Sequence, residues 1–167
     1  WKAPVDFVPD EGVYEAYYNG KSPYQADGDP CSLYVMGEDC LYLNVWKAAE
    51  PSTGKKPVMV WIYGGGFETG GTVDPQYDCY NFITENPDVI VVTVAYRLAA
   101  YGFMRLSHLP DGADYPDAQN LGIMDQMMGL KWVHENIAAF GGDPDNVTIF
   151  GESAGGSSCT LISLVKG

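Results

Sequence analysis

Residues 148–156 read Thr-Ile-Phe-Gly-Glu-Ser-Ala-Gly-Gly, and the rest of the chain can be interpreted around Ser153 at their centre. Residues 151–155 fit the pattern G-x-S-x-G, the nucleophile elbow, in which a strained turn lifts a serine hydroxyl above a sheet edge between small neighbours. The pentapeptide alone also occurs in ordinary glycine-rich turns. Here a β-prone run at 147–150 precedes it and helix-compatible apolar spacing follows at 153–165, so the sequence predicts the required strand, turn and helix.

The overall composition is that of one globular domain with a sizeable core. The chain has 167 residues, of which 46% are hydrophobic and 19% charged. A net charge of −13, with only nine Lys and Arg, argues against nucleic acid as a partner. No apolar run approaches the roughly 18 residues of a membrane span. The N-terminus lacks an initiator methionine and the features of a signal peptide, so we expect a processed or truncated chain.

Hydrophobic periodicity predicts alternating strands and helices after an irregular start. Residues 1–38 are expected to form surface loops. Residues 41–46 alternate as a strand does, whereas 57–63 and 89–96 are continuous apolar runs typical of strands buried on both faces. A short helix is expected at 77–86 and a longer one at 120–140, stopped by Gly141-Gly142-Asp143-Pro144. This order predicts an α/β fold with a mostly parallel sheet flanked by helices.

Three consecutive glycines, Gly64 to Gly66, follow the first buried run and suggest acyl transfer. Attack of a serine on an ester builds negative charge on oxygen, which preformed N–H donors stabilise by roughly 3 to 4 kcal/mol each. The N–H groups of Gly65 and Gly66, with that of Ala154 after the serine, can supply an oxyanion hole. The alternatives are a plain loop or a phosphate cradle. A P-loop is excluded because no Gly-Lys-Ser/Thr follows.

Several motifs in register resemble the type-B carboxylesterase (cholinesterase-like) family of α/β-hydrolases. The resemblance covers about residues 38–165. The motifs are EDCLYLNV at 38–45, PVMVWIYGGGF at 57–67, VAYRL at 94–98, NLGIMDQ at 120–126 and FGGDP at 140–144 leading to Gly156. The resemblance implies the α/β-hydrolase fold. It also implies an N-terminal-half fragment, truncated after the helix that follows the nucleophile.

The resemblance assigns roles at the site to five positions. Ser153 would be the nucleophile, and Gly65, Gly66 and Ala154 would form the oxyanion hole. Glu152 would be a buried carboxylate near the site, with a structural or electrostatic role outside the triad.

The resemblance also assigns structural roles. Arg97 and Asp125 would form an ion pair that braces the sheet, and Cys40 matches a family disulfide cysteine with Cys31 as its plausible upstream partner. From the residues alone, these two cysteines could close a loop in an oxidising compartment or stay reduced. The sequence departs from the family pattern at two positions: it has Ala95 where the family usually has Asn, and Ala99 where the family usually has Gly.

A serine nucleophile needs a base oriented by a carboxylate, and this fold class orders them Ser, then Asp or Glu, then His. After Ser153 only fourteen residues remain, without Asp, Glu or His. His108 and His134 both precede the serine, so neither is expected to be the base. We therefore expect residues 1–167 to be a partial α/β-hydrolase domain, missing the extreme N-terminus and the C-terminal part, with an exposed sheet edge.

The sequence thus predicts a carboxylic ester hydrolase that forms an acyl-enzyme on Ser153 and needs no cofactor and no metal. Its partner would be a small-molecule ester. The alternatives are an inactive fragment and a cholinesterase-like adhesion or binding domain, which typically lacks the nucleophile. Localisation stays open, because a Cys31–Cys40 bridge would favour a secreted or periplasmic protein over a cytoplasmic one.

Overall fold

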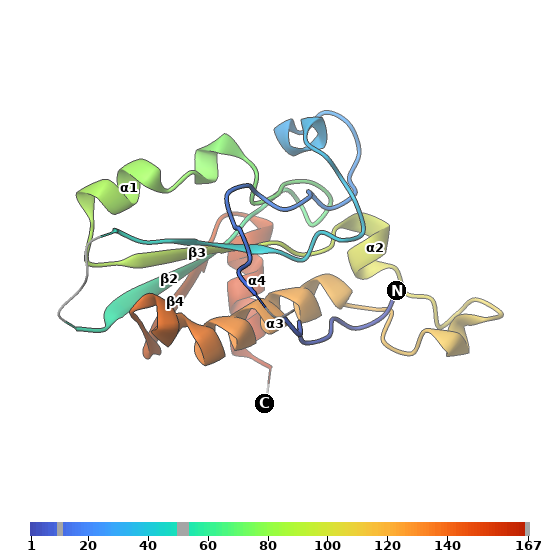
Figure 1. Ribbon diagram of the computed structural model, residues 1–167. Coiled ribbons are helices and arrows are strands. Elements are labelled where there is room, and N and C mark those ends of the chain that lie inside the picture. The colour runs from blue at the N-terminus through green and yellow to red at the C-terminus, as the bar shows by residue number, and fades with distance from the viewer. Residues whose placement is uncertain (10–11, 50–53, 166–167) are drawn as a thin grey trace.

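A four-stranded sheet forms the centre of the computed structural model, which describes residues 1–9, 12–49 and 54–165 (Figure 1). The strand order is β1-β3-β2-β4. β2 pairs in parallel with β3 and with β4, whereas β1 pairs antiparallel with β3. The strands are β1 (Leu43–Trp46), β2 (Lys56–Ile62), β3 (Ile90–Val94) and β4 (Gly142–Gly151). The sheet is therefore mostly parallel, as predicted.

Helices connect the strands and cover both faces of the sheet. They are α1 (Tyr80–Glu85), α2 (Ala99–Phe103), α3 (Leu121–Asn136) and α4 (Ala154–Ser163). Figure 1 shows α1 on one side of the sheet and α3 and α4 on the other. The crossovers from β2 to β3 and from β3 to β4 bring the carboxyl ends of these parallel strands to one edge.

Element boundaries differ from the sequence predictions where backbone geometry overrides hydrophobic spacing. The predicted helix at 120–140 ends as an α-helix at Asn136 and continues as a 3-10 turn over Ile137–Phe140. Gly141, at φ +87°, stops it in the left-handed conformation typical of helix C-termini. β4 then begins at Gly142 instead of Val147, because Gly142 already pairs with Lys56 ahead of a register shift. The five-residue α2 was not predicted.

The core lies between the sheet and α3. Each buried residue here is at most 3% exposed: Val58, Val60, Ile90, Val92, Val94, Val133 and Ile137. All five residues of β3 are buried, as expected for the continuous apolar run that encodes it. At roughly 1.5 to 3 kcal/mol per buried aliphatic side chain, this cluster provides the main drive for folding.

β4 lies at an edge of the sheet in the part of the chain that the structure describes. It pairs with β2 on one side, and its residues are half-buried or exposed except for Gly142. An unpaired strand edge presents free N–H and C=O groups to other chains. This geometry agrees with the exposed edge that the sequence predicted.

The N-terminal segment, described over residues 1–9 and 12–40, has little regular structure but is tied to distant parts of the fold. Its side chains reach α2, α3, β1 and the loop after β2. The contacts are Trp1 Nε1 to Ala100 O, Asp6 to Lys131, Asn19 to Asn44 and Gln25 to Gly70. The segment is thus an integral layer of the domain, not a loose extension.

Two buried tyrosines lock the carboxyl ends of β2 and β3 together. The Tyr63 hydroxyl donates to Tyr96 O at 2.9 Å and accepts from Tyr96 N at 3.2 Å, while the Tyr96 hydroxyl donates to Tyr63 O at 2.8 Å. The two rings stack at 4.4 Å between centroids. Burial raises the pKa of both phenols well above the usual value near 10. Each ring thus caps the backbone of the other strand.

These raised pKa values predict that alkaline pH destabilises the fold. The unfolded chain releases phenolic protons near pH 10, whereas the folded chain retains them. Stability is therefore complete below about pH 10 and falls as the pH rises towards the folded-state pKa values, by up to about 1.4 kcal/mol per pH unit for each group. Urea unfolding between pH 8 and 12 measures this slope.

The double variant Tyr63→Phe/Tyr96→Phe should show a smaller slope. The remaining slope reflects other buried acids such as Cys31 and Cys40. The exposed-tyrosine variant Tyr80→Phe, as a control, should keep the wild-type slope. Equal slopes for wild type and double variant would contradict the assignment.

Candidate active site

Ser153 occupies a strained turn between β4 and α4. Its φ of +52° and ψ of −117° are unusual for a residue with a side chain. The turn fits only because its neighbours are glycines: a Cβ on Gly155 would lie 1.9 Å from Ile62 O, and one on Gly151 would lie 2.6 Å from the same atom. The Gly155 N–H donates to Glu152 O at 2.8 Å. The glycine spacing therefore encodes the close packing of this turn on β2.

The serine is exposed and lies at the beginning of α4. Ala154, the next residue, is the first residue of the helix, where backbone N–H groups have no acceptor within the helix. The helix dipole also places partial positive charge there. An oxygen carrying negative charge beside Ser153 would meet favourable electrostatics.

The glycine loop that follows β2 lies directly against the serine. A Cβ on Gly64 would fall 3.1 Å from Ser153 Cβ and 2.6 Å from Glu152 Oε2. Gly65, at φ +102°, opens a tight turn in which its carbonyl accepts from the N–H groups of Glu68 and Thr69, both at 3.0 Å. The structure thus brings the start of the glycine loop, Gly64, against Ser153 at the edge where parallel β2 and β4 end.

A strained contact from α2 holds the middle of the glycine loop. The Ala99 N–H donates to Phe67 O at 2.7 Å, and both residues have positive φ, +47° and +63° respectively. The rings of Phe67 and Phe103 pack edge to face at 5.1 Å between centroids. Ala99 stands where the family resemblance expects glycine, so the loop keeps its geometry at a cost in backbone strain.

Arg97 and Asp125 form a bidentate ion pair beneath this region. Arg97 Nε and Nη2 donate to the two carboxylate oxygens at 2.7 and 2.6 Å, and the Arg97 backbone N–H adds a third bond at 3.0 Å. The Asp125 side chain is fully buried, and that of Arg97 is 16% exposed. Because removing one partner of a buried pair typically costs about 3 to 5 kcal/mol, the pair stabilises the turn between β3 and α2 against α3.

Glu152 is not the buried carboxylate that the sequence predicted. Glu152 is exposed in the turn between β4 and α4. It nevertheless lies beside the glycine loop through its contact with the Gly64 position.

Neither histidine is positioned as a base for Ser153. His108 and His134 are both exposed, the first in the loop after α2 and the second on α3. Among the described residues, no histidine is hydrogen-bonded to the serine.

The possible Cys31–Cys40 disulfide is not formed in the structure, which has both thiols free and buried. Cys31 Sγ donates to Gly71 O at 3.7 Å, whereas Cys40 lines a pocket beside Arg97. Burial raises the pKa of Cys31 to about 12 and that of Cys40 to about 11. The reactive thiolate is scarce at neutral pH, so both thiols are poorly disposed to oxidation.

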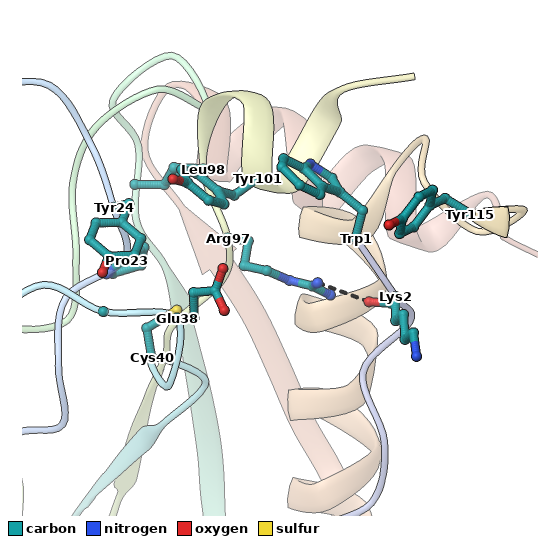
Figure 2. A pocket seen from close by; sticks show the side chains of 11 residues that line it. Trp1, Lys2, Pro23, Tyr24, Glu38, Cys40, Arg97, Leu98, Tyr101 and Tyr115 are labelled. Carbon is teal, nitrogen blue, oxygen red and sulfur yellow. Dashed lines mark hydrogen bonds between the residues drawn. The ribbon is translucent and has the colours of Figure 1, made fainter. Parts of the chain in front are cut away.

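The pocket beside Cys40 is separate from the serine site. Figure 2 shows its aromatic lining, to which the N-terminus contributes Trp1, and the Arg97 guanidinium donating to Lys2 O. Trp1 and Tyr101 stack at 5.8 Å with nearly parallel rings. The pocket, of about 310 Å³, includes neither Ser153 nor the glycine loop in its lining.

The described part of the chain has neither a metal-binding cluster nor a membrane-spanning helix. No group of three or more His, Cys, Asp or Glu side chains there is arranged to hold a metal ion. No helix in those ranges has the length and apolar character needed to cross a membrane.

Comparison with known proteins connects this geometry to esterases. Residues 1–166 match the family described as the Carboxylesterase family. The para-nitrobenzyl esterase of Bacillus subtilis is 54% identical over 127 residues, which cover 76% of this chain and 25% of that protein. The cholinesterase of Mus musculus is 49% identical over 126 residues, covering 75% of this chain and 20% of that protein.

The solved structures agree with the fold. A thermophilic PNB esterase superimposes with a TM-score of 0.84 at 48% sequence identity, covering 94% of this chain and 32% of that one. This likeness confirms the predicted α/β-hydrolase fold. The chain spans between 20% and 32% of the length of these relatives.

The strain at Ala99 leads to a stability prediction. Ala99→Gly should raise the free energy of unfolding by up to about 1 kcal/mol, because relief of the left-handed alanine outweighs the entropy cost of glycine. Ala100, the next residue, does not have positive φ and serves as the control. Ala100→Gly should lower the free energy of unfolding by about 0.5 to 1 kcal/mol. Chemical denaturation measures both. A loss of stability in Ala99→Gly equal to that in Ala100→Gly would contradict the strain.

Proposed function

Because the chain belongs to the carboxylesterase family, we propose that it carries the nucleophilic part of a carboxylic ester hydrolase. Ser153 is the nucleophile. The N–H groups of Gly65, Gly66 and Ala154 form the oxyanion hole. The observation that carries the proposal is the contact between the strained Ser153 turn and the glycine loop, in which a Cβ on Gly64 would lie 3.1 Å from Ser153 Cβ.

The chemistry follows from this arrangement. Ser153 Oγ attacks the ester carbonyl while a base takes the hydroxyl proton, and the carbonyl oxygen becomes an oxyanion held by the three N–H groups. The tetrahedral intermediate collapses as the C–O bond to the alcohol breaks, and the protonated base gives its proton to the alcohol. Water then cleaves the acyl-enzyme by the same route and regenerates the serine.

We propose that the base and its orienting carboxylate lie in sequence outside these 167 residues. The described residues place no histidine against Ser153, and this fold class orders the triad as Ser, then acid, then His. Residues 1–167 would then be part of one α/β-hydrolase domain. The greater length of the relatives supports this division of the site.

We propose small-molecule carboxylic esters as substrates. The names of the relatives, para-nitrobenzyl esterase and cholinesterase, both describe hydrolysis of an ester but indicate different alcohols. p-Nitrophenyl acetate is a suitable first substrate, because its small acyl group and good leaving group make few demands on the pockets.

Labelling with a fluorophosphonate tests the nucleophile. We expect the probe to modify Ser153 in the longer protein containing this chain, with the adduct mapped by mass spectrometry, and to react far more slowly with residues 1–167 alone. Ser153→Ala should abolish labelling and lower p-nitrophenyl acetate hydrolysis by about four orders of magnitude or more. Ser157→Ala, an exposed serine one turn further along α4, should retain both.

Two outcomes would contradict the proposal in different ways. A folded longer protein that neither reacts with the probe nor hydrolyses esters would favour an adhesion or binding domain. Equal labelling rates for residues 1–167 alone and for the longer protein would locate the base within this chain.

A further inference from the structure

Gln25, in the irregular N-terminal segment, pairs its side-chain amide with the backbone of Gly70. The Gly70 N–H donates to Gln25 Oε1 at 2.9 Å, and Gln25 Nε2 donates to Gly70 O at 2.8 Å. Nε2 also contacts Ser22 Oγ at 3.1 Å and Pro23 O at 3.2 Å. The amide therefore satisfies both backbone polar groups of one residue, Gly70, which requires a donor and an acceptor side by side.

Gly70 is the last residue of the glycine loop and packs back on its first. A Cβ on Gly70 would lie 2.8 Å from Gly64 O, so the two ends of the loop are in contact. Within the loop, Gly65 O accepts from Glu68 and Thr69. Residues 64–70 are thus one closed turn whose two ends touch.

Three contacts fix this closed turn at different points. Tyr63 fixes its beginning through the lock with Tyr96, and the Ala99 N–H fixes Phe67 in the middle. Gln25 fixes the end of the turn. Of the three contacts, only this one comes from the N-terminal segment.

The segment that carries Gln25 is itself held firmly. Ser22 is 1% exposed, donates its N–H to Val35 O at 2.9 Å and accepts from the Gly37 N–H at 3.1 Å. A Cβ on Gly71 would contact Ser22 Oγ at 3.1 Å. Gln25 therefore extends from a rigid base to the loop.

We propose that Gln25 is a positioning residue for the oxyanion hole, acting through Gly70 on the N–H groups of Gly65 and Gly66. This inference rests on the proposed ester hydrolysis. Gln25 does not touch the substrate. It fixes the end of the turn so that the donors are preorganised before charge develops, which is when such donors contribute most to the rate.

The test is Gln25→Glu in the longer protein containing this chain. At pH 8 the carboxylate can accept from Gly70 N–H but cannot donate to Gly70 O, so the pairing is half lost. We expect kcat for p-nitrophenyl acetate to fall about tenfold with KM within about twofold of wild type. The affinity for a trifluoromethyl ketone, which forms a tetrahedral adduct with the serine, should fall in proportion to kcat.

The pH dependence separates positioning from a general loss of structure. A protonated carboxyl group has the same donor and acceptor arrangement as the amide. The ratio of variant to wild-type kcat should therefore rise as the pH falls from 8 to 5, towards the range where a carboxyl facing a carbonyl takes up a proton. Gln25→Met, similar in length but without either group, should lose activity at every pH.

Gln119→Glu is the matched control, since it makes the same charge change at an exposed position. It should keep wild-type kinetics and show no pH-dependent ratio. Hydrogen exchange of residues 64–70 in folded protein should be faster in Gln25→Glu than in Gln119→Glu.

The outcomes distinguish this inference from the proposed function. An active wild type with unchanged kcat and loop exchange in Gln25→Glu would overturn the positioning role and leave ester hydrolysis intact. A parallel loss in Gln119→Glu would also overturn it. A folded wild type that hydrolyses no ester would overturn both proposals, whatever the exchange rates.

Discussion

The close approach of the Ile62 carbonyl to the glycines around Ser153 is the constraint on which the rest of the site depends. Ile62 is the last residue of β2, in register with Gly151 of β4, and its oxygen occupies the space that a side chain on Gly155 would need. The next residues of the same strand lead into the glycine loop. One strand end therefore fixes both the Ser153 turn and the start of the glycine loop, and their relative position follows from parallel pairing.

Polar interactions at the strand ends complement this packing. The Tyr63–Tyr96 lock and the Arg97–Asp125 pair satisfy backbone groups where the sheet hydrogen bonds stop. Each is buried, so its hydrogen bonds form in a low-dielectric environment where loss of one partner is expensive. The strain at Ser153, Phe67 and Ala99 persists because these contacts over-determine the backbone.

The sequence predicted those parts of the structure that local chemistry encodes. The glycines around Ser153 signal a steric requirement, and the uninterrupted apolar runs signal β2 and β3, so the fold and the elbow could be predicted. Gln25, α2 and the tyrosine lock could not, because their roles depend on residues far along the chain. The prediction that Glu152 is buried was wrong, because the exposure of this residue depends on which segments surround its turn. The possible Cys31–Cys40 bridge was implied by the family resemblance, yet the two thiols face different neighbours.

The ties of the N-terminal segment also bear on biosynthesis. Trp1 bonds to a carbonyl 99 residues away, and Asp6 pairs with Lys131 across 125 residues. At ribosomal rates of about 5 to 20 residues per second, the segment waits on the order of 10 s before α3 has been synthesised. During that interval Trp1 and Asp6 lack the partners that they bind in the fold. The contacts of Trp1 and Asp6 can therefore form only after α2 and α3 have been synthesised.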